Sequence, residues 1–511
     1  MAAPTAEEQL LLEHINAARL DPLGDAARYI SSYAATATSA DADINSALRF
    51  FGVSGPALLA AYSALTPVKP LAWNDALSNA AQGHDAAMIA ADSQTHQAPG
   101  EADLGARFTA AGYAFTRGGE NIFAFGDSVL QTHAAFMVDW GSGPNGMQSP
   151  PGHRDNIMDG SFREIGLAIV HESNGATSVG PLVVTEDLGT RSTSGVFILG
   201  VAYNDTNGDD FYSVGEAVGG LQVSLGSASV GNFATGGYAL QSSLAGAQTV
   251  TLTGAGLSGA VSVSLNLTSA QNVKLDVVSG TELKTSASAT ISGPVSRIEA
   301  IGATGLSLRA AGANDHTLTG ATGSDTLSAD AGANYIRGGN GDDSIAGGTG
   351  FDDINGNQGN DTAVSGGGDD WVVGGKDNDS LTGSAGQNLV YGNLGNDTCE
   401  GGDGADIVRG GQDGDIVRGG NGDDFVSGDK GDDTMTGGAG ADIFHTFGDA
   451  GIDRVLDFNL AQGDRVMLDP RTQFAVSQSG ADTVINMTGG GQMILVGVSM
   501  SSLTGNWIFG A

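Results

Sequence analysis

The sequence is poor in cysteine, in basic residues and in long apolar segments. It holds one cysteine, Cys399, among 511 residues, so no internal disulfide can form. Its 21 Lys and Arg residues are outnumbered by 58 Asp and Glu residues, which gives a net charge of −37. Nucleic acid and anionic membrane surfaces are therefore poor partners. No stretch approaches the roughly 20 apolar residues of a membrane span, and residues 1–14 lack the features of a signal peptide.

Glycine, in contrast, is abundant, with 82 residues. From Gly320 to His445 a nine-residue pattern recurs fourteen times without an insertion or deletion. Each copy has a glycine-rich turn, Asp or Asn at its sixth position and an apolar residue at its eighth. Because one copy cannot bury its single apolar side chain, we expect the copies to stack into a solenoid with a continuous core. The alternative is a disordered glycine-rich linker, and the unbroken register argues against it.

The sixth positions predict two rows of acidic side chains. Two copies make one coil, so equivalent turns recur every eighteen residues. One row contains Asp325, Asp343, Asp361, Asp379, Asp397, Asp415 and Asp433, and the other contains Asn334, Asp352, Asp370, Asn388, Asp406, Asp424 and Asp442. Carboxylates stacked at strand spacing, roughly 4.8 Å, repel one another unless cations lie between them. Calcium accepts several carboxylate and carbonyl oxygens, so we predict calcium at the Asp turns and weaker sites at the two Asn turns.

These repeats resemble the G-G-x-G-x-D-x-U-x repeats of the RTX family. The resemblance implies a parallel β-roll with calcium in its turns, and a protein that leaves a Gram-negative bacterium through the type I secretion machinery. That route uses an uncleaved C-terminal signal, and residues 452–470 resemble the segment that follows RTX arrays. Calcium is scarce in the cytosol, where the charges would keep the array expanded, and it would drive folding outside the cell. Cys399 occupies an eighth position, so we expect a small buried hydrophobe rather than a reactive thiol.

Residues 1–193 differ in character from the repeats. Apolar residues at helical spacing predict helices over 6–20, ended by Asp21-Pro22, and within 71–90. Residues 162–170 and 181–189 are predicted to be strands. Helices interleaved with short strands favour a layered α/β/α arrangement.

Four polar residues stand out in this part of the chain: His96 in SQTHQ, Glu120 in GGENI, Asp139 in FMVDWG and His153 in PGHRDNIM. Two imidazoles and two carboxylates in one cleft could bind a transition metal or perform acid/base chemistry. Their spacing alone does not bring them together. His84 lies on an apolar helix face and is expected to be a core histidine.

The combination of INAARLDP, GGENI and PGHRDNIM followed by EIG resembles the CAP superfamily of cysteine-rich secretory, antigen 5 and pathogenesis-related proteins. The resemblance implies an α/β/α sandwich in which His96, Glu120, Asp139 and His153 line a cleft that holds zinc or another divalent cation in some members. Asp139 departs from the family, which usually has Glu there.

CAP domains include lipid binders, signalling or toxin modules and occasional proteases, so the fold leaves the chemistry open. No Ser, Thr or Cys nucleophile accompanies the histidines in a recognisable motif. Glu164 is expected to hold a strand end by hydrogen bonds.

A change in composition near Ser192 introduces a second candidate calcium site. Positions 1, 3, 5, 7, 9 and 12 of a calcium loop are matched by Asp205, Asn207, Asp209, Phe211 (through its carbonyl), Ser213 and Glu216. Position six should be glycine but is Asp210. The flanking residues read as strands, and the segment resembles the small β-sandwich B-repeats of bacterial surface proteins. A polar hairpin loop without calcium is the alternative.

The predicted fold is multidomain: an N-terminal α/β/α CAP sandwich, a small β-sandwich and a C-terminal parallel β-roll with a β-rich cap. The predicted limits are a CAP domain at 1–193, a small β domain at 194–255, a β-rich connector with degenerate repeats at 256–319, the roll at 320–445, and a cap with the secretion signal at 446–511.

Two functions remain open for the CAP domain. The first is an extracellular binding module for a lipid, glycan or protein, free or at the cell surface. The second is a divalent-metal-dependent hydrolase, in the manner of a protease, that uses the His and acidic residues of the cleft.

Overall fold

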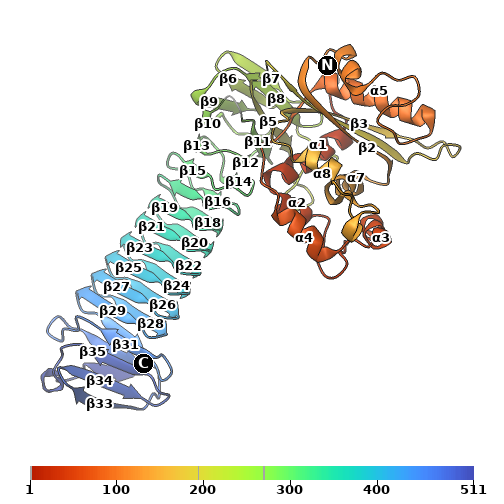
Figure 1. Ribbon diagram of the computed structural model, residues 1–511. Helices are drawn as coiled ribbons and strands as arrows, with labels where there is room; N and C mark the ends of the chain where they lie inside the picture. Colours follow the sequence, from red (N-terminus) through yellow and green to blue (C-terminus); the bar gives the residue numbers. More distant parts are fainter. Residues whose placement is uncertain (1–2, 194, 269–270, 511) are drawn as a thin grey trace. The chain divides into compact units, whose positions relative to one another are not determined.

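The computed structural model describes residues 3–193, 195–268 and 271–510. The chain forms two compact units. The first runs to Ala287 and includes Ile301–Ala303, and the second comprises Ser288–Ala300 and Thr304 onward. Figure 1 labels the elements of both units. No helix within these described ranges is long and apolar enough to cross a membrane.

The first unit begins with a four-stranded sheet in the order β1-β3-β4-β2, with helices on both faces (Figure 1). The strands are β1 (Ala72–Trp73), β2 (Phe115–Gly126), β3 (Glu164–His171) and β4 (Leu182–Arg191). The helices are α1 (Ala6–Leu20), α2 (Pro22–Ala26), α3 (Ala42–Phe51), α4 (Gly55–Ser63), α5 (Asp75–Ala91), α6 (Leu104–Ala110), α7 (Val129–Ala134) and α8 (Gly152–Ile157). This arrangement confirms the predicted α/β/α sandwich.

Alternating side chains of the central strands build a separate core on each face of the sheet. On β4, Val184 and Leu188 pack with α1, whereas Val183 packs with Met88 of α5 on the other face. The helix predicted over 6–20 is confirmed as α1. Its start is fixed by a capping box, in which the Thr5 hydroxyl accepts from the Glu8 N–H and the Glu8 carboxylate accepts from the Thr5 N–H.

Eight strands after the CAP domain form two packed sheets, which confirms the predicted small β-sandwich. One sheet has the order β8-β5-β11-β12 and the other the order β7-β6-β9-β10. Their bounds are β5 (Val196–Tyr203), β6 (Gln222–Leu225), β7 (Ala228–Gly231), β8 (Gly237–Ser242), β9 (Gly246–Thr253), β10 (Val261–Leu267), β11 (Val273–Val278) and β12 (Glu282–Thr285).

The sandwich therefore continues beyond residue 255, where the sequence predicted its end. The glycine-rich stretch after β9 is a hairpin connection, because β10 returns antiparallel to β9. Asn272 ties the sandwich to the CAP domain. Its side-chain amide donates to the carbonyls of Pro70 and Arg163 at 2.9 and 2.8 Å, and its side-chain oxygen accepts from the Phe197 N–H.

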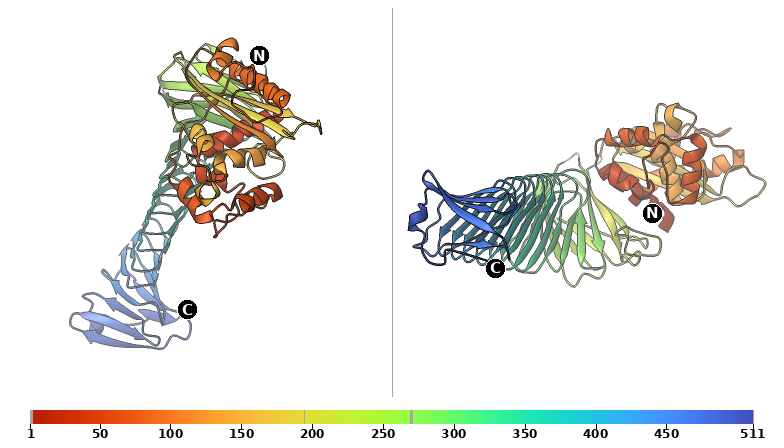
Figure 2. Two further views of the ribbon diagram at one scale, coloured as in Figure 1. Left: turned by 45° about the vertical axis from the view of Figure 1, so that its right-hand side comes forward. Right: turned by 90° about the horizontal axis from the view of Figure 1, so that it is seen from below.

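The second unit is a parallel β-roll built from two sheets, whose strands stack in chain order in Figures 1 and 2. Each strand pairs in parallel with the strand two elements later, so that Leu327 lies beside Ile345 and Ile336 beside Ile354. This pairing confirms the eighteen-residue coil. One sheet contains β13 (Ala289–Ser292), β15 (Ser307–Ala310), β17 (Thr326–Ala329), β19 (Ser344–Thr349), β21 (Thr362–Gly367), β23 (Ser380–Ala385), β25 (Thr398–Asp403), β27 (Ile416–Asn421) and β29 (Thr434–Ala439). The other contains β14 (Arg297–Ala300), β16 (Thr317–Thr319), β18 (Asn334–Asn340), β20 (Asp352–Gln358), β22 (Trp371–Lys376), β24 (Leu389–Leu394), β26 (Ile407–Gln412), β28 (Phe425–Lys430) and β30 (Ile443–Thr446).

The eighth residues of all fourteen copies are buried between the two sheets, from Leu327 to Phe444. The roll also begins earlier than residue 320, because β13 to β16 form coils in the same parallel register. At the other end, β31 (Ile452–Val455) and β32 (Arg465–Leu468) continue the two sheets. A meander of β33 (Phe474–Ser479), β34 (Asp482–Met487) and β35 (Gln492–Leu495) follows, and β36 (Ile508–Gly510) pairs with β32.

Cys399 lies in the core of the roll with none of its surface exposed, as its repeat position predicted. Burial raises the pKa of its thiol well above the usual value.

The Cys399 thiol should therefore be inert while the roll is folded and react when the coils separate. We expect a thiol reagent to label the protein slowly in calcium and much faster in a calcium chelator. The Cys399→Ala variant supplies the blank, and equal labelling rates in the two conditions would contradict the prediction.

Candidate functional sites

The acidic turns of the roll are linked by hydrogen bonds that run from coil to coil. One carboxylate oxygen, Oδ1, accepts a hydrogen bond from the backbone N–H of the equivalent residue one coil earlier. The Asp343 N–H, for example, donates to Asp361 Oδ1 at 2.8 Å, and the Asp361 N–H donates to Asp379 Oδ1 at 2.8 Å. This ladder fixes the orientation of every carboxylate without using its second oxygen.

The second oxygen, Oδ2, is buried in these turns and makes no hydrogen bond. The residues concerned are Asp343, Asp352, Asp361, Asp370, Asp379, Asp397, Asp406, Asp415, Asp424, Asp433 and Asp442. Buried charged oxygens without a partner are costly unless a cation satisfies them. Asp325, the first in its row, differs because its Oδ2 accepts from the Ala321 N–H at 2.7 Å.

Because glycine has no side chain, it leaves room for these oxygens beside the backbone. A Cβ atom added at Gly338 would lie 2.3 Å from Asp343 Oδ2 and 2.6 Å from the Gly356 carbonyl oxygen. Carboxylate and backbone carbonyl oxygens therefore converge beside Gly338, which is the donor set that calcium takes. The same pair of oxygens recurs at Gly401, beside Asp406 Oδ2 and the Gly419 carbonyl. These residues fit the calcium that the sequence predicts.

The two Asn turns differ from the Asp turns in a way that bears on calcium. Asn334 and Asn388 keep the Oδ1 bond of the ladder, accepting from the N–H groups of His316 and Asp370 at 3.1 Å. Their second atom is a donor, and it points at the carbonyls of Gly347 and Gly401 at 3.4 and 3.5 Å. An amide N–H thus occupies the place of a ligand oxygen, which supports the prediction of weaker sites there.

The carboxylates of the roll have strongly raised pKa values when no cation is bound. Burial, followed by repulsion between coils, raises the pKa of Asp379 and Asp415 to about 8 and that of Asp343 and Asp424 to about 7. Bringing these groups together in their charged form is therefore unfavourable near neutral pH. The roll needs either protons or cations at its turns.

Two acidic residues beyond the array continue the rows and were not predicted from the sequence. Asp464 accepts a hydrogen bond from the Asp442 N–H at 3.1 Å. Burial, together with repulsion by the neighbouring Asp433, raises the pKa of Asp453 to about 8. Their distances from the previous ligands, 22 and 20 residues, break the eighteen-residue period. The Gly-x-Asp-x-apolar pattern of residues 451–455, which the repeats also have, was the available signal.

The predicted loop at 205–216 closes around its own polar groups. Glu216 accepts from the N–H groups of Thr206 and Ser213 at 2.9 Å, and Asp205 accepts from Gly208. Asp210, where glycine was expected, adopts a left-handed conformation with φ of 59° and pairs with Lys284. Asp205, Asp209 and Glu216 do not form a three-residue ligand group within the described parts of the chain. Calcium in this loop stays a prediction.

In the CAP domain, the four predicted cleft residues form two separate pairs. Glu120, on β2, accepts from His96 Nδ1 at 2.9 Å and pairs with Arg107 of α6 through its other oxygen. Buried His84 approaches the same carboxylate, with its Nε2 3.9 Å from Glu120 Oε1, while its Nδ1 contacts Glu101 at 2.8 Å. Glu120 is thus held by Arg107 and His96, while His84 Nε2 lies nearby without a hydrogen-bond partner among the described residues.

The second pair, Asp139 and His153, is held more rigidly. Asp139 ends a π-helical turn, η1 (Ala135–Asp139), and has a left-handed φ of 54°. Its carboxylate accepts from the His153 N–H at 3.1 Å and from His153 Nδ1 at 2.8 Å. Backbone strain and π-turns concentrate at functional sites. The double contact fixes the imidazole with Nδ1 toward Asp139 and leaves Nε2 available.

This arrangement does not fit a zinc ion held by all four residues. The carboxylates of Glu120 and Asp139 are already engaged by Arg107 and the histidines, and no three of the four residues form a ligand group. Asn121 and Asn156 of the two motifs connect the pairs. Asn121 donates to the His153 carbonyl at 3.1 Å, and Asn156 donates to the Glu120 carbonyl at 3.2 Å.

Two consecutive acidic residues on β4, missed by the sequence analysis, lie buried behind these pairs. Burial raises the pKa of Glu186 to about 7 although Asn121 donates to it at 2.9 Å. Burial and repulsion by Glu120 raise the pKa of Asp187 further. Glu164 behaves as predicted and holds strand ends, because it accepts from Asn74, Tyr113 and Arg191.

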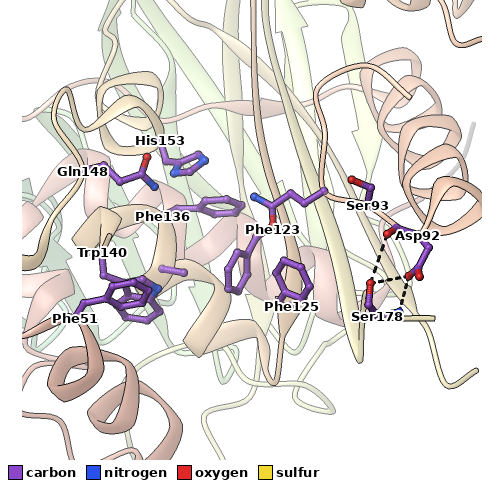
Figure 3. A pocket seen from close by; sticks show the side chains of 12 residues that line it. Phe51, Asp92, Ser93, Phe123, Phe125, Phe136, Trp140, Gln148, His153 and Ser178 are labelled. Atoms are coloured by element: carbon purple, nitrogen blue, oxygen red, sulfur yellow. Dashed lines mark hydrogen bonds between the residues drawn. The ribbon is translucent and has the colours of Figure 1, made fainter. Parts of the chain in front are cut away.

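A groove of about 540 Å³ opens beside His153 (Figure 3). Its walls are largely aromatic, with Phe51, Phe123, Phe125, Phe136 and Trp140 contributing side chains. Polar groups from three further segments complete the lining, namely Asp92, Ser93, Gln94, Gln148 and Ser178. His96 and Glu120 do not line it. The groove therefore joins an apolar surface to one oriented imidazole.

Comparison with known proteins agrees with the division of the chain into an N-terminal α/β domain and a C-terminal array of repeats. Residues 12–186 match the model of the CAP (Cysteine-rich secretory protein) family, and segments 319–354, 347–381, 373–408 and 409–444 match the RTX calcium-binding nonapeptide repeat. The chain thus carries a CAP domain followed by an array of RTX calcium-binding nonapeptide repeats.

Two solved structures show distant similarity to the chain. An extracellular protein containing an SCP domain from Bacillus anthracis str. Ames is 21% identical over 24% of this chain and 35% of its own, with a TM-score of 0.19. The extracellular lipase LipA from Serratia marcescens is 17% identical over 42% of this chain and 40% of its own, with a TM-score of 0.20. The chain thus spans well under half the length of each. No curated protein matches it.

Substitution of Gly338 by Ala tests the calcium cradle. The added methyl group would crowd Asp343 Oδ2 and the Gly356 carbonyl. We expect weaker calcium binding and a loss of about 1–3 kcal/mol in the stability of the calcium-loaded roll. Gly367→Ala is the matched control, because a Cβ there meets nothing within 4 Å. Calcium titration monitored by circular dichroism makes the measurement, and equal midpoints for the two variants would refute the assignment.

The raised pKa values predict an unusual response to acid. An Asp whose folded pKa lies near 6 to 8 rather than the ordinary 3.8 binds more protons when folded. The roll without calcium should therefore be most stable below about pH 4 and lose stability as the pH rises through 6 to 8. Thermal unfolding of the second unit in a chelator, measured from pH 8 to pH 5, should show a rising midpoint. A falling midpoint would contradict the raised values.

Proposed function

We propose that this is a secreted protein whose CAP domain binds an amphipathic ligand outside the cell and whose RTX array folds when calcium reaches it after export. The observation that carries the binding role is the aromatic groove. Binding sites for small molecules are typically concave and apolar with a few convergent polar groups. The groove has five aromatic side chains and the oriented His153.

The state of the roll without calcium supports export in an unfolded form. Among the described residues, eleven buried Oδ2 atoms of the repeat Asp side chains have no hydrogen-bond partner, and a calcium-poor cytosol would leave them uncompensated. The type I machinery would then receive an expanded C-terminal region. The absence of disulfides fits the same route, because no cross-link has to form after passage. Retention at the cell surface would add presentation to the same binding role.

Lipid is the first ligand class to test. Phe125 is 46% exposed at the groove and offers an apolar contact to an acyl chain. A glycan would stack on the same rings, and a protein ligand would insert an apolar side chain. The net charge of −37 argues for uncharged or zwitterionic headgroups.

Sedimentation with phosphatidylcholine vesicles in calcium tests lipid binding by the full chain. We expect Phe125→Ser to weaken binding by about tenfold, since burying a Phe side chain contributes roughly 1.5–3 kcal/mol. Phe474→Ser is the matched control, because Phe474 is also 46% exposed and lies in the second unit. Binding should survive in a His96→Ala/His153→Ala variant. Equal loss in the two Phe variants would exclude the groove as the lipid site.

A hydrolase is the second candidate, and the Asp139–His153 pair favours it. An imidazole fixed by a buried carboxylate can act as a general base toward a water or substrate hydroxyl in the groove. Under this alternative, His153→Ala abolishes turnover of an ester or peptide substrate while the circular dichroism spectrum is unchanged. His171→Ala, on an exposed strand end, is the control. Turnover that persists in His153→Ala would exclude this role.

A further inference from the structure

Three residues that carried no recognisable motif meet in the interior of the CAP domain. His14 lies on α1, Asp25 on α2 and His133 on α7. His133 Nε2 is 2.8 Å from Asp25 Oδ2, and His14 Nδ1 is 3.9 Å from Asp25 Oδ1. The exposed fractions of the three residues are 5%, 2% and 0%. The group is separate from the groove, which none of them lines.

Hydrogen bonding within the protein does not satisfy this group. His14 Nδ1 and Asp25 Oδ1, which face each other, are both buried and have no hydrogen-bond partner. Buried polar atoms are almost always partnered in native proteins. Two converging nitrogen and oxygen atoms without partners, next to a third imidazole nitrogen, mark a place for a cation.

The distances allow one ion to contact all three residues. One ligand atom from each lies within 4.8 Å of the others. In a tetrahedral site with zinc distances of about 2.1 Å, two ligand atoms lie about 3.4 Å apart. An ion would therefore draw the most widely separated ligand atoms together by up to about 1.4 Å.

The surroundings shield the group from water. The Phe211 ring packs against His14 with centroids 4.9 Å apart, and the Arg28 guanidinium lies 3.8 Å from the centre of that ring. Tyr29 contacts His133 edge-on at 5.6 Å. Phe211 belongs to the loop at 205–216, so the sandwich covers a site built by CAP helices.

We propose that His14, Asp25 and His133 form a transition-metal site that takes zinc. Two imidazoles and one carboxylate are a donor set that zinc uses in proteins, with a fourth position left for water. Calcium and magnesium prefer oxygen ligands alone. The site connects α1, α2 and α7 and does not use the groove. The zinc proposal is therefore independent of the ligand proposed above.

Calorimetric titration of the full chain with zinc, in saturating calcium to occupy the roll, tests the site. We expect one zinc ion to bind to the native chain and to His171→Gln, an exposed histidine outside the group. His14→Gln should reduce the affinity at least about tenfold. Asp25→Asn, which keeps the shape of the side chain, should do the same and covers the case in which His14→Gln fails to fold. Circular dichroism checks the fold of each variant.

Cobalt supplies a second readout. Cobalt(II) bound at a four-coordinate nitrogen and oxygen site gives visible absorption bands, which should appear with the native chain and be absent from His14→Gln and Asp25→Asn. The His96→Gln/His153→Gln variant separates the two regions of the domain. Loss of zinc binding in that variant with retention in His14→Gln would overturn the proposal, as would the absence of stoichiometric binding to the native chain.

Discussion

Repulsion between stacked carboxylates is the constraint on which the second unit depends. The coil geometry places equivalent Asp side chains next to each other, and the hydrogen-bond ladder through Oδ1 leaves Oδ2 beside a glycine in every repeat Asp except Asp370. No protein donor among the described residues satisfies these oxygens. A solenoid that buries one apolar side chain per copy has a thin core, and the free energy gained by burying that core offsets little of the cost. The calcium requirement thus follows from the fold itself.

The CAP domain is stabilised differently, and without disulfides. Its core spans both faces of the sheet, and Arg19 of α1 acts as an internal clamp. The guanidinium of Arg19 is fully buried and donates to the carbonyls of Lys69, Ile157 and Asp159. One helix thereby fixes two distant loops. Such a network forms without oxidation, which fits the export in an unfolded form that we propose.

Patterns that repeat or that belong to a specific motif could be predicted from the sequence. The nine-residue register predicted the coil, the burial of Cys399 and the rows of Asp, because identical neighbours leave little freedom in how they pack. The motifs around Glu120 and His153 predicted the CAP fold. They did not predict Arg107, which engages Glu120 from a helix that carries no motif and divides the four residues into two pairs.

Features made by tertiary contact alone could not be predicted. His14, Asp25 and His133 are 11 and 108 residues apart along the chain and share no pattern. The aromatic walls of the groove come from three separate segments, so no window of the sequence contains them. The end of the sandwich was misplaced because a glycine-rich hairpin connection looks the same as a domain boundary. Asp453 and Asp464 were missed because the loops before them break the period.

Hydrogen–deuterium exchange of the full chain, with calcium and then with a chelator, tests the central claim most directly. Because uncompensated carboxylates destabilise the roll, we expect amides of residues 320–445 to be protected in calcium and to exchange rapidly without it, while α1, α5, β3 and β4 stay protected in both conditions. Protection of residues 320–445 that is unchanged by the chelator would contradict it, because the roll would then be stable without any cation between its carboxylates.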